Sequence, residues 1–156
     1  MKEDKQWVTH TYSALVSIKD MNTGLLSAQS RHRSYIMTGK ASYIENYEKD
    51  KQKVYKSLKK LRYLTIDNLS QQNKINAIEP LIKKRFTFFD KSIKLIRQNS
   101  QNLETQNQIE NQQFPPIIQI ISEEMEDEEK NYYNSAQSKQ IRDLSIFLPW
   151  LLSLMF

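Results

Sequence analysis

The chain has 156 residues, of which 38% are hydrophobic and 26% are charged, and its formal net charge at pH 7 is +5. This length and composition suit one folded domain with a packed core, which excludes a disordered polymer. Because cysteine is absent, disulfides, thiolate catalysis and zinc–thiolate sites are also excluded. The absence of cysteine is compatible with both a reducing and an oxidising compartment.

Four long helices are expected, near residues 4–37, 41–66, 70–98 and 115–146. Glycine and proline are scarce, and apolar residues recur at alternating spacings of three and four residues, which is typical of a packed helix face. The predicted core positions are Trp7, Thr11, Ala14, Ile18, Met21, Leu25, Ala28, His32 and Tyr35; Ile44, Tyr47, Val54, Leu58, Leu61 and Thr65; Ile75, Ile78, Ile82, Phe86, Phe89, Ile93 and Ile96; and Phe114, Ile118, Ile121, Met125 and Tyr132.

A few residues with strong backbone preferences indicate where these helices end. Gly39 suits a C-cap in the left-handed region, and residues 67–70 suit a short turn followed by an N-cap. Ten of the sixteen residues from 98 to 113 are Asn or Gln, so this segment is expected to be a connection or a frayed helix extension. Residues 114–116, Phe-Pro-Pro, restart a helix, since proline is tolerated in a first turn.

The short connections favour an all-α fold, an antiparallel up-down-up-down four-helix bundle of long helices spanning residues 1–143. Both chain ends then lie at one end of a rod about 40–50 Å long. Gly39 and the Asn/Gln-rich segment are expected at the far end, and residues 67–70 at the end that holds the termini.

The last thirteen residues, 144–156, carry no charge and are too short to cross roughly 30 Å of hydrocarbon. We interpret them as the first part of a truncated transmembrane helix that continues the fourth bundle helix; the alternative is a tail folded back on the bundle. Trp7 and Trp150 are then candidates for the membrane interface, where an indole ring keeps its N–H in water. Trp7 could equally cap the core.

The charges are distributed unevenly along the chain. A basic helix that could bind nucleic acid or anionic lipid holds Lys49, Lys51, Lys53, Lys56, Lys59, Lys60 and Arg62. An acidic block on the fourth helix holds Glu123, Glu124, Glu126, Asp127, Glu128 and Glu129. Solvated faces, or pairing of the two blocks inside the bundle, are the favoured interpretation. The sequence argues against nucleic acid as a partner, since it contains no recognised nucleic-acid module.

No reaction centre is recognisable in the sequence. The two histidines, His10 and His32, do not follow a glutamate at the spacing of a di-metal bundle site; a polar surface position and a hydrogen-bonded core position are expected for them. Consecutive carboxylates on a helix lack the turn geometry of a calcium loop. Neither a Gly-rich phosphate loop nor a catalytic serine arrangement is present. The chain is therefore expected to be non-catalytic, with no cofactor and no metal.

Four segments, in this order, resemble a known family. They are WVTHT at residues 7–11, SAQSRHRSYIMTG at 27–39, LRYLTIDNLSQQ at 61–72 and MEDEE at 125–129. Together they are similar to a CHASE domain of the third type, a cyclase/histidine kinase-associated sensing extracellular domain. Gln29 stands where that family has an acid and Ser34 where it has a glycine, so the family's charge network is not carried over unchanged.

The resemblance implies a function that the composition alone does not. It implies a periplasmic or extracellular input domain in a cell-membrane receptor, flanked by membrane helices, with a histidine kinase, cyclase or chemotaxis-type output on the cytoplasmic side. The implied partners are the lipid bilayer, a second copy in a homodimer, and a ligand or partner protein that the sequence does not identify. The alternative is a structural or adaptor bundle that binds anionic lipid or nucleic acid through its basic helix.

The resemblance also singles out polar residues near the predicted core faces. Arg33, Glu128, Glu129 and Gln29 are candidates for a polar signalling network inside the bundle. Arg33 is predicted to pair with Glu128, and Glu129 is the competing partner.

Overall fold

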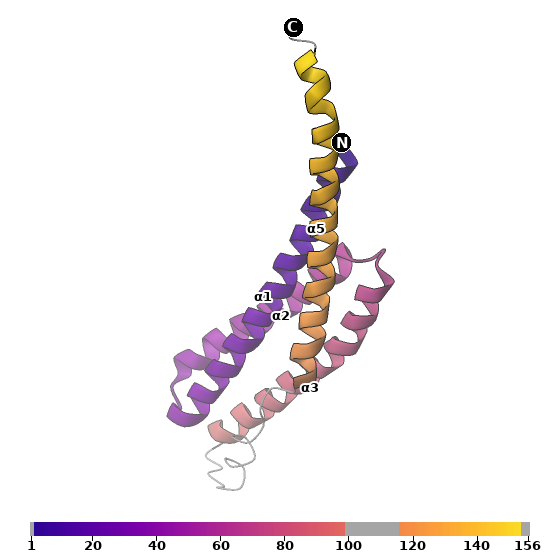
Figure 1. Cartoon of the computed structure of the whole chain (residues 1–156). Helices are drawn as coiled ribbons and strands as arrows, with labels where there is room; N and C mark the ends of the chain where they lie inside the picture. The colour runs from indigo at the N-terminus through magenta and orange to yellow at the C-terminus, as the bar shows by residue number, and fades with distance from the viewer. Residues whose placement is uncertain (1, 99–115, 154–156) are drawn as a thin grey trace.

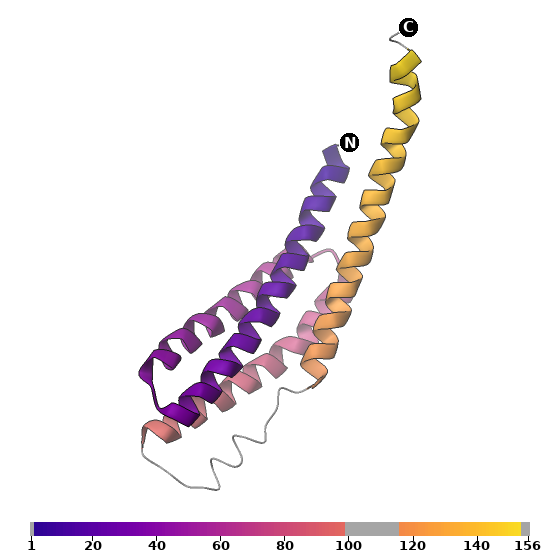
Figure 2. The ribbon, with the colours of Figure 1, turned by 60° about the vertical axis from the view of Figure 1, so that its left-hand side comes forward.

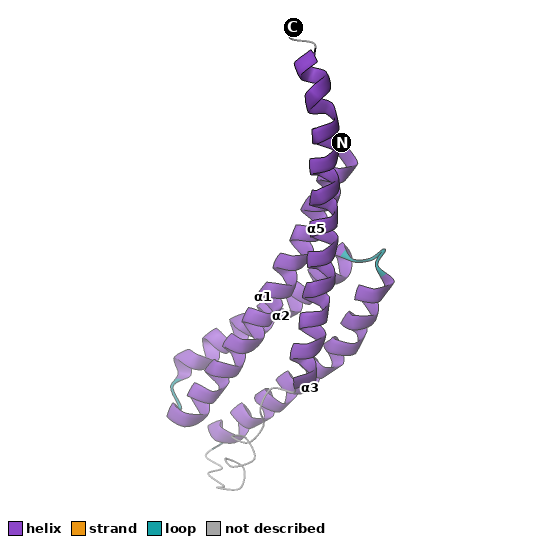
Figure 3. Ribbon diagram, in the orientation of Figure 1, coloured by secondary structure: helices purple, strands orange, loops and turns teal. Residues whose placement is uncertain are grey.

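The computed structural model describes residues 2–98 and 116–153, and every regular element in these ranges is an α-helix (Figures 1 and 3). Helix α1 spans Lys2–Thr38, α2 spans Ala41–Leu64, α3 spans Leu69–Arg97 and α5 spans Pro116–Ser153. These bounds confirm the four predicted helices and the all-α fold class. Residues 99–115, with most of the predicted Asn/Gln-rich connection and core position Phe114, lie outside the described residues.

The helices alternate in direction, as predicted for an antiparallel bundle. Both chain ends lie at the same end of the molecule, and the turn between α1 and α2 lies at the opposite end (Figures 1 and 2). The turn between α2 and α3 lies on the side of the termini, and the start of α1 and the second half of α5 project beyond it (Figure 2). Helices α1 and α5 are therefore the two that connect the bundle to the chain ends.

Both described turns have the predicted capping chemistry. Gly39 has φ 67°, and its N–H donates to the Tyr35 carbonyl at 2.7 Å, which is the left-handed C-cap that glycine adopts without steric cost. At the other turn, the Asn68 side chain accepts from the Gln71 N–H at 3.1 Å and caps α3. The Gln72 amide also donates to the Thr65 carbonyl at 2.8 Å, so this turn is held from both helices.

The predicted apolar faces form the core. All predicted positions from Thr11 to Ile93 are buried, and Ile96 and Ile121 pack against the core from its edge. Tyr132 is the exception: 44% of its surface is exposed, so its predicted core position is wrong. Tyr132 lies one helical turn after Glu128, whose carboxylate accepts hydrogen bonds from Asn68 and Ser70 at the α2–α3 turn, so Tyr132 lies beyond that turn. Helix α1 remains a neighbour there, since the ring centroids of Tyr12 and Tyr133 are 6.4 Å apart.

The ion pairs between helices correct one prediction about charge. Cations of α2 pair with acids of α1 and α3: Lys53 with Asp20 (3.0 Å), Lys51 with Asp90 (2.6 Å) and Arg62 with Glu79 (2.6 Å). The acidic block of α5 pairs instead with Lys74 of α3 and with Lys130 of α5 itself. The two blocks do not face each other, because α5 packs on α1 and α3 rather than on α2. Exposed lysines at 49, 56, 59 and 60 confirm the solvated alternative.

Candidate functional site

A polar cluster lies where α5 crosses the α2–α3 turn. The Glu128 carboxylate accepts from Asn68 Nδ2 at 3.0 Å and from Ser70 Oγ at 2.8 Å, and it forms an ion pair with Lys74. Partial burial raises the pKa of Glu128, but the hydrogen bonds from Lys74, Asn68 and Ser70 outweigh it and hold the pKa below its usual value. A charged Glu128 thus joins α5 to the cap of α3.

The pKa of the next residue, Glu129, is shifted in the opposite direction. Its exposed fraction is 4%, and burial together with the neighbouring Glu128 charge raises its pKa to about 7. It lies beside the fully buried Gln71, whose Nε2 donates to the Met125 carbonyl at 3.0 Å. Gln71 Oε1 has no hydrogen-bond partner among the described residues. At pH values slightly below 7, Glu129 is therefore mostly protonated while its neighbour Glu128 is charged.

The predicted pair of Arg33 and Glu128 is wrong. Arg33 is exposed near the α1–α2 turn, whereas Glu128 contacts the α2–α3 turn at the other end of the bundle. The 24 residues of α2 separate these turns by roughly 36 Å. Glu129 does not take the place of Glu128 beside Arg33, since it packs at the same end as Glu128.

Gln29 and Lys74 complete the account of the predicted network. Gln29 is half-buried on α1, and its Oε1 has no hydrogen-bond partner among the described residues. Lys74 was missed by sequence reasoning, because a lone lysine on α3 carries no signal for the helix that it meets. A signalling role for Arg33, Gln29, Glu128 and Glu129 stays a prediction.

A second buried polar group lies in the half of the bundle that is far from the termini. His32 Nε2 lies 2.5 Å from Ser92 Oγ, and its ring stacks on Phe89 with centroids 4.2 Å apart. Since the Ser92 hydroxyl donates to the Phe89 carbonyl, Nε2 of His32 is the donor to Ser92. Burial, followed by the nearby Arg85 charge, lowers the pKa of His32 to about 4. His32 is thus the hydrogen-bonded core histidine that was predicted, and His10 is exposed, as predicted.

The residues proposed for the membrane interface lie in helical segments. Trp7 belongs to α1 and Trp150 to α5, but their side chains lie outside what the structure describes. The predicted tail continues α5 as helix to Ser153. Among the described residues, no helix combines the length and the apolar character needed to cross a membrane. Within the same ranges, no three His, Cys, Asp or Glu side chains group as a metal site would require.

The contact between Lys74 and Glu128 is expected to be worth more than an exposed ion pair. Both side chains are mostly buried, so Lys74→Met leaves the Glu128 charge poorly compensated and should lower the free energy of unfolding by about 1–3 kcal/mol. A double-mutant cycle with Glu128→Gln, measured by chemical denaturation of the chain, should give a coupling energy of about 1 kcal/mol or more.

The pair of Lys130 and Glu126 supplies the matched control. Lys130 Nζ lies 2.8 Å from Glu126 Oε1 but is more exposed to solvent, so the cycle of Lys130→Met and Glu126→Gln should give a much smaller coupling energy than the cycle of Lys74 and Glu128. Additive effects of the Lys74 and Glu128 substitutions would show that this contact does not hold α5 to α3 in solution.

The comparisons with known proteins agree with this architecture. The family model described as CHASE3 domain matches residues 4–139. The crystal structure of the Rhodopseudomonas palustris histidine kinase HK9 sensor domain superposes with a TM-score of 0.56 at 20% identity, over 83% of this chain and 97% of that chain. At this identity the superposition shows a shared fold. No curated protein matches the sequence. Because the family match extends over most of the described bundle, this chain belongs to the CHASE3 domain family.

Proposed function

We propose that this chain is the extracytoplasmic sensory domain of a transmembrane signalling receptor, whose output is a histidine kinase, a cyclase or a chemotaxis-type domain. The match to the CHASE3 domain family over residues 4–139 carries this proposal. The position of the chain ends supports it, since a domain looped out between two membrane helices needs both ends on one side (Figure 1).

The packing of α1 against α5 suggests how a stimulus reaches the membrane. These helices contact each other along the bundle and continue beyond the α2–α3 turn toward the two chain ends (Figure 2). A small shift of one helix along or around the other therefore changes the relative position of both ends. Such a device requires two packings that differ by only a few kcal/mol, which a stimulus can then select.

The membrane attachment is part of the same proposal. The apolar residues 144–156 are the head of a second membrane helix, and the helical continuation of α5 to Ser153 supports a stiff connection. Trp7 and Trp150 then lie at the interface between the bilayer and water. In this proposal the sensory domain lies on the extracytoplasmic side of the cell membrane, as in the family that the chain belongs to.

A homodimer is the proposed state in the receptor, and the outer face of α1 supports it. Tyr12 and Met37 expose 58% and 77% of their surfaces, and they lie on one side of the helix with Val16 and Arg33. Tyr12 and Val16 are four residues apart, as are Arg33 and Met37, and this spacing places each pair on one face of a helix. A second copy of the chain is the partner that would cover it, and Arg33 would then face that copy.

The membrane attachment is tested by liposome sedimentation of the chain. The intact chain should co-sediment with neutral vesicles, and deletion of residues 147–156 should remove this binding, since exposed apolar segments partition into lipid. Replacing Leu151 and Leu152 by lysine should act like the deletion.

The same assay separates the receptor from the adaptor. An adaptor that uses the basic helix requires anionic vesicles, keeps binding after the deletion, and loses it when Lys49, Lys56, Lys59 and Lys60 become glutamine. In the complete gene, an apolar span before Trp7 and an output domain after Phe156 accord with the receptor, whereas their absence accords with the adaptor.

A further inference from the structure

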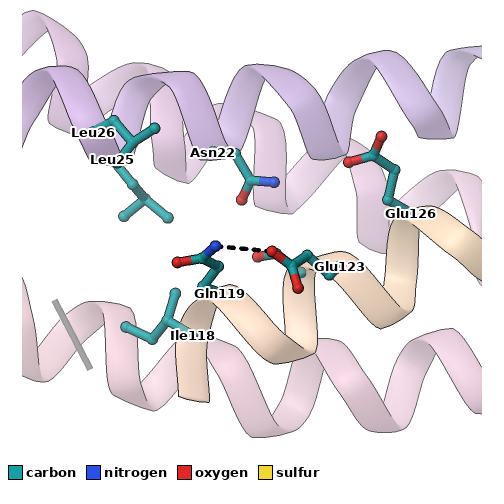
Figure 4. Close-up of a pocket in the computed structure, with 8 residues that line it drawn as sticks. Asn22, Leu25, Leu26, Ile118, Gln119, Glu123 and Glu126 are labelled. Atoms are coloured by element: carbon teal, nitrogen blue, oxygen red, sulfur yellow. Dashed lines mark hydrogen bonds between the residues drawn. The ribbon is translucent and has the colours of Figure 1, made fainter. Parts of the chain in front are cut away.

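A cavity of about 300 Å³ opens between α1 and α5 (Figure 4). Leu25 and Leu26 of α1 and Ile118 of α5 form its apolar wall. Leu25 and Ile118 belong to the buried core, whereas Leu26 is largely exposed at the mouth. This volume is at the lower end of the range for ligand pockets, so a small ligand with a short aliphatic part fits it.

The opposite wall of the cavity is acidic. Glu123 and Glu126 line it from α5, and Asn22 approaches from α1 (Figure 4). Glu123 accepts from Gln119 Nε2 at 2.8 Å, and Glu126 pairs with Lys130, which is outside the lining. None of the lining residues is Lys, Arg or His. A cationic ligand is therefore attracted, and a carboxylate ligand is repelled.

A buried hydroxyl in the lining points independently to a ligand. Ser122 is 1% exposed, and its Oγ has no hydrogen-bond partner among the described residues. A buried polar group without a partner is costly, and serine Oγ can accept a hydrogen bond. An ammonium group carries three donors and no acceptor, so it matches a hydroxyl oxygen and two carboxylates at once.

We propose that this cavity binds a small primary aliphatic amine in its ammonium form. The ammonium group lies between Ser122, Glu123 and Glu126, and the alkyl chain lies against Leu25, Leu26 and Ile118. An occupant of this cavity touches both α1 and α5, the helices that lead to the chain ends. Its role as a stimulus rests on the proposed sensory function, whereas its binding does not.

Titration of the full chain with n-pentylammonium chloride, followed by calorimetry and by NMR, tests the site. Saturable binding is expected for pentylammonium, and much weaker binding for pentanol and pentanoate, which keep the chain but lose the positive charge. The variant Glu123→Gln with Glu126→Gln should weaken binding about tenfold or more, because it removes both carboxylates. Ser122→Ala should weaken it several-fold without unfolding the chain, since that hydroxyl has no partner in the described structure.

A double substitution outside the cavity is the matched control. Glu124 and Asp127 are exposed on α5 and do not line the cavity, so Glu124→Gln with Asp127→Asn removes the same charge and should leave the affinity unchanged. Equal binding of the three probes, no saturation at millimolar concentration, or equal weakening by the control variant would overturn the site. If the amine does not bind to a receptor that still signals, the amine site is rejected and the sensory function is kept. If the amine binds and the receptor output does not change, the site is kept and its role as a stimulus is rejected.

Discussion

Glu129→Gln is expected to stabilise the domain above pH 7 and to expose a pH dependence that the native chain conceals. The pKa of Glu129 is raised to about 7 by burial and by Glu128, so the folded state holds a proton that the unfolded state has released. Its contribution to stability is present below about pH 4.5 and is lost as the pH rises through 7. The loss is roughly 1–3 kcal/mol after allowance for solvent screening.

His32 has the opposite effect over the same range. Burial and the Arg85 charge lower the pKa of His32 to about 4, so between about pH 4 and 6.5 the unfolded state binds a proton that the folded state does not bind. Its contribution is present above about pH 6.5 and is lost as the pH falls through 4. Between about pH 4.5 and 6.5, Glu129 makes the free energy of unfolding fall with pH and His32 makes it rise. The two effects nearly cancel, so the free energy of unfolding of the native chain should hardly change with pH in this interval.

Urea denaturation at several pH values separates the two groups. Glu129→Gln should make stability rise with pH between about 4.5 and 6.5, and His32→Gln should make it fall over the same interval. Glu124→Gln, at an exposed position on α5, is the control and should run parallel to the native chain. If Glu129→Gln also ran parallel to the native chain, Glu129 would be charged in the folded state at pH 6.

Gly24→Ala is expected to destabilise the bundle even though alanine is the better helix former. A Cβ at position 24 of α1 would lie 2.8 Å from Val54 Cγ2 and 3.3 Å from the Asp50 carbonyl oxygen of α2. Valine is restricted about χ1 and a backbone oxygen cannot move alone, so the two helices must separate. The overpacking costs roughly 1–3 kcal/mol, against a propensity gain of about 1 kcal/mol.

Removing the obstacle should recover part of that loss. Val54→Ala alone creates a small cavity in the core, but combined with Gly24→Ala it should be more stable than the sum of the two single effects predicts. Thr23→Ala, on the exposed side of the same turn, is the control and should not destabilise the chain. Thermal denaturation in which Gly24→Ala unfolded above the native chain would contradict the close approach of α1 and α2.

The candidate site was less predictable from the sequence than the fold. The sequence indicates Glu128 and Glu129 as candidates, but it predicts a pair of Glu128 with Arg33, which lies at the other end of the bundle. Both residues lie close to core faces, and helical periodicity contains no information on how far along a neighbouring helix a contact will fall. The contact of Lys74 with Glu128 and the cavity near Ser122 depend on how the helices are positioned along one another, so the sequence did not predict them.

The sequence by itself determined the local structure: four helices with one apolar face each, the left-handed cap at Gly39 and the Asn68 cap of α3. These features depend on residues that are three or four positions apart, and such spacings can be taken directly from the sequence. The tertiary structure alone decided which helices contact each other and at which positions along their axes. Interhelical packing, including the close approach at Gly24, sets the register in which Tyr132 passes beyond the core while Glu129 is buried and Glu128 meets Lys74.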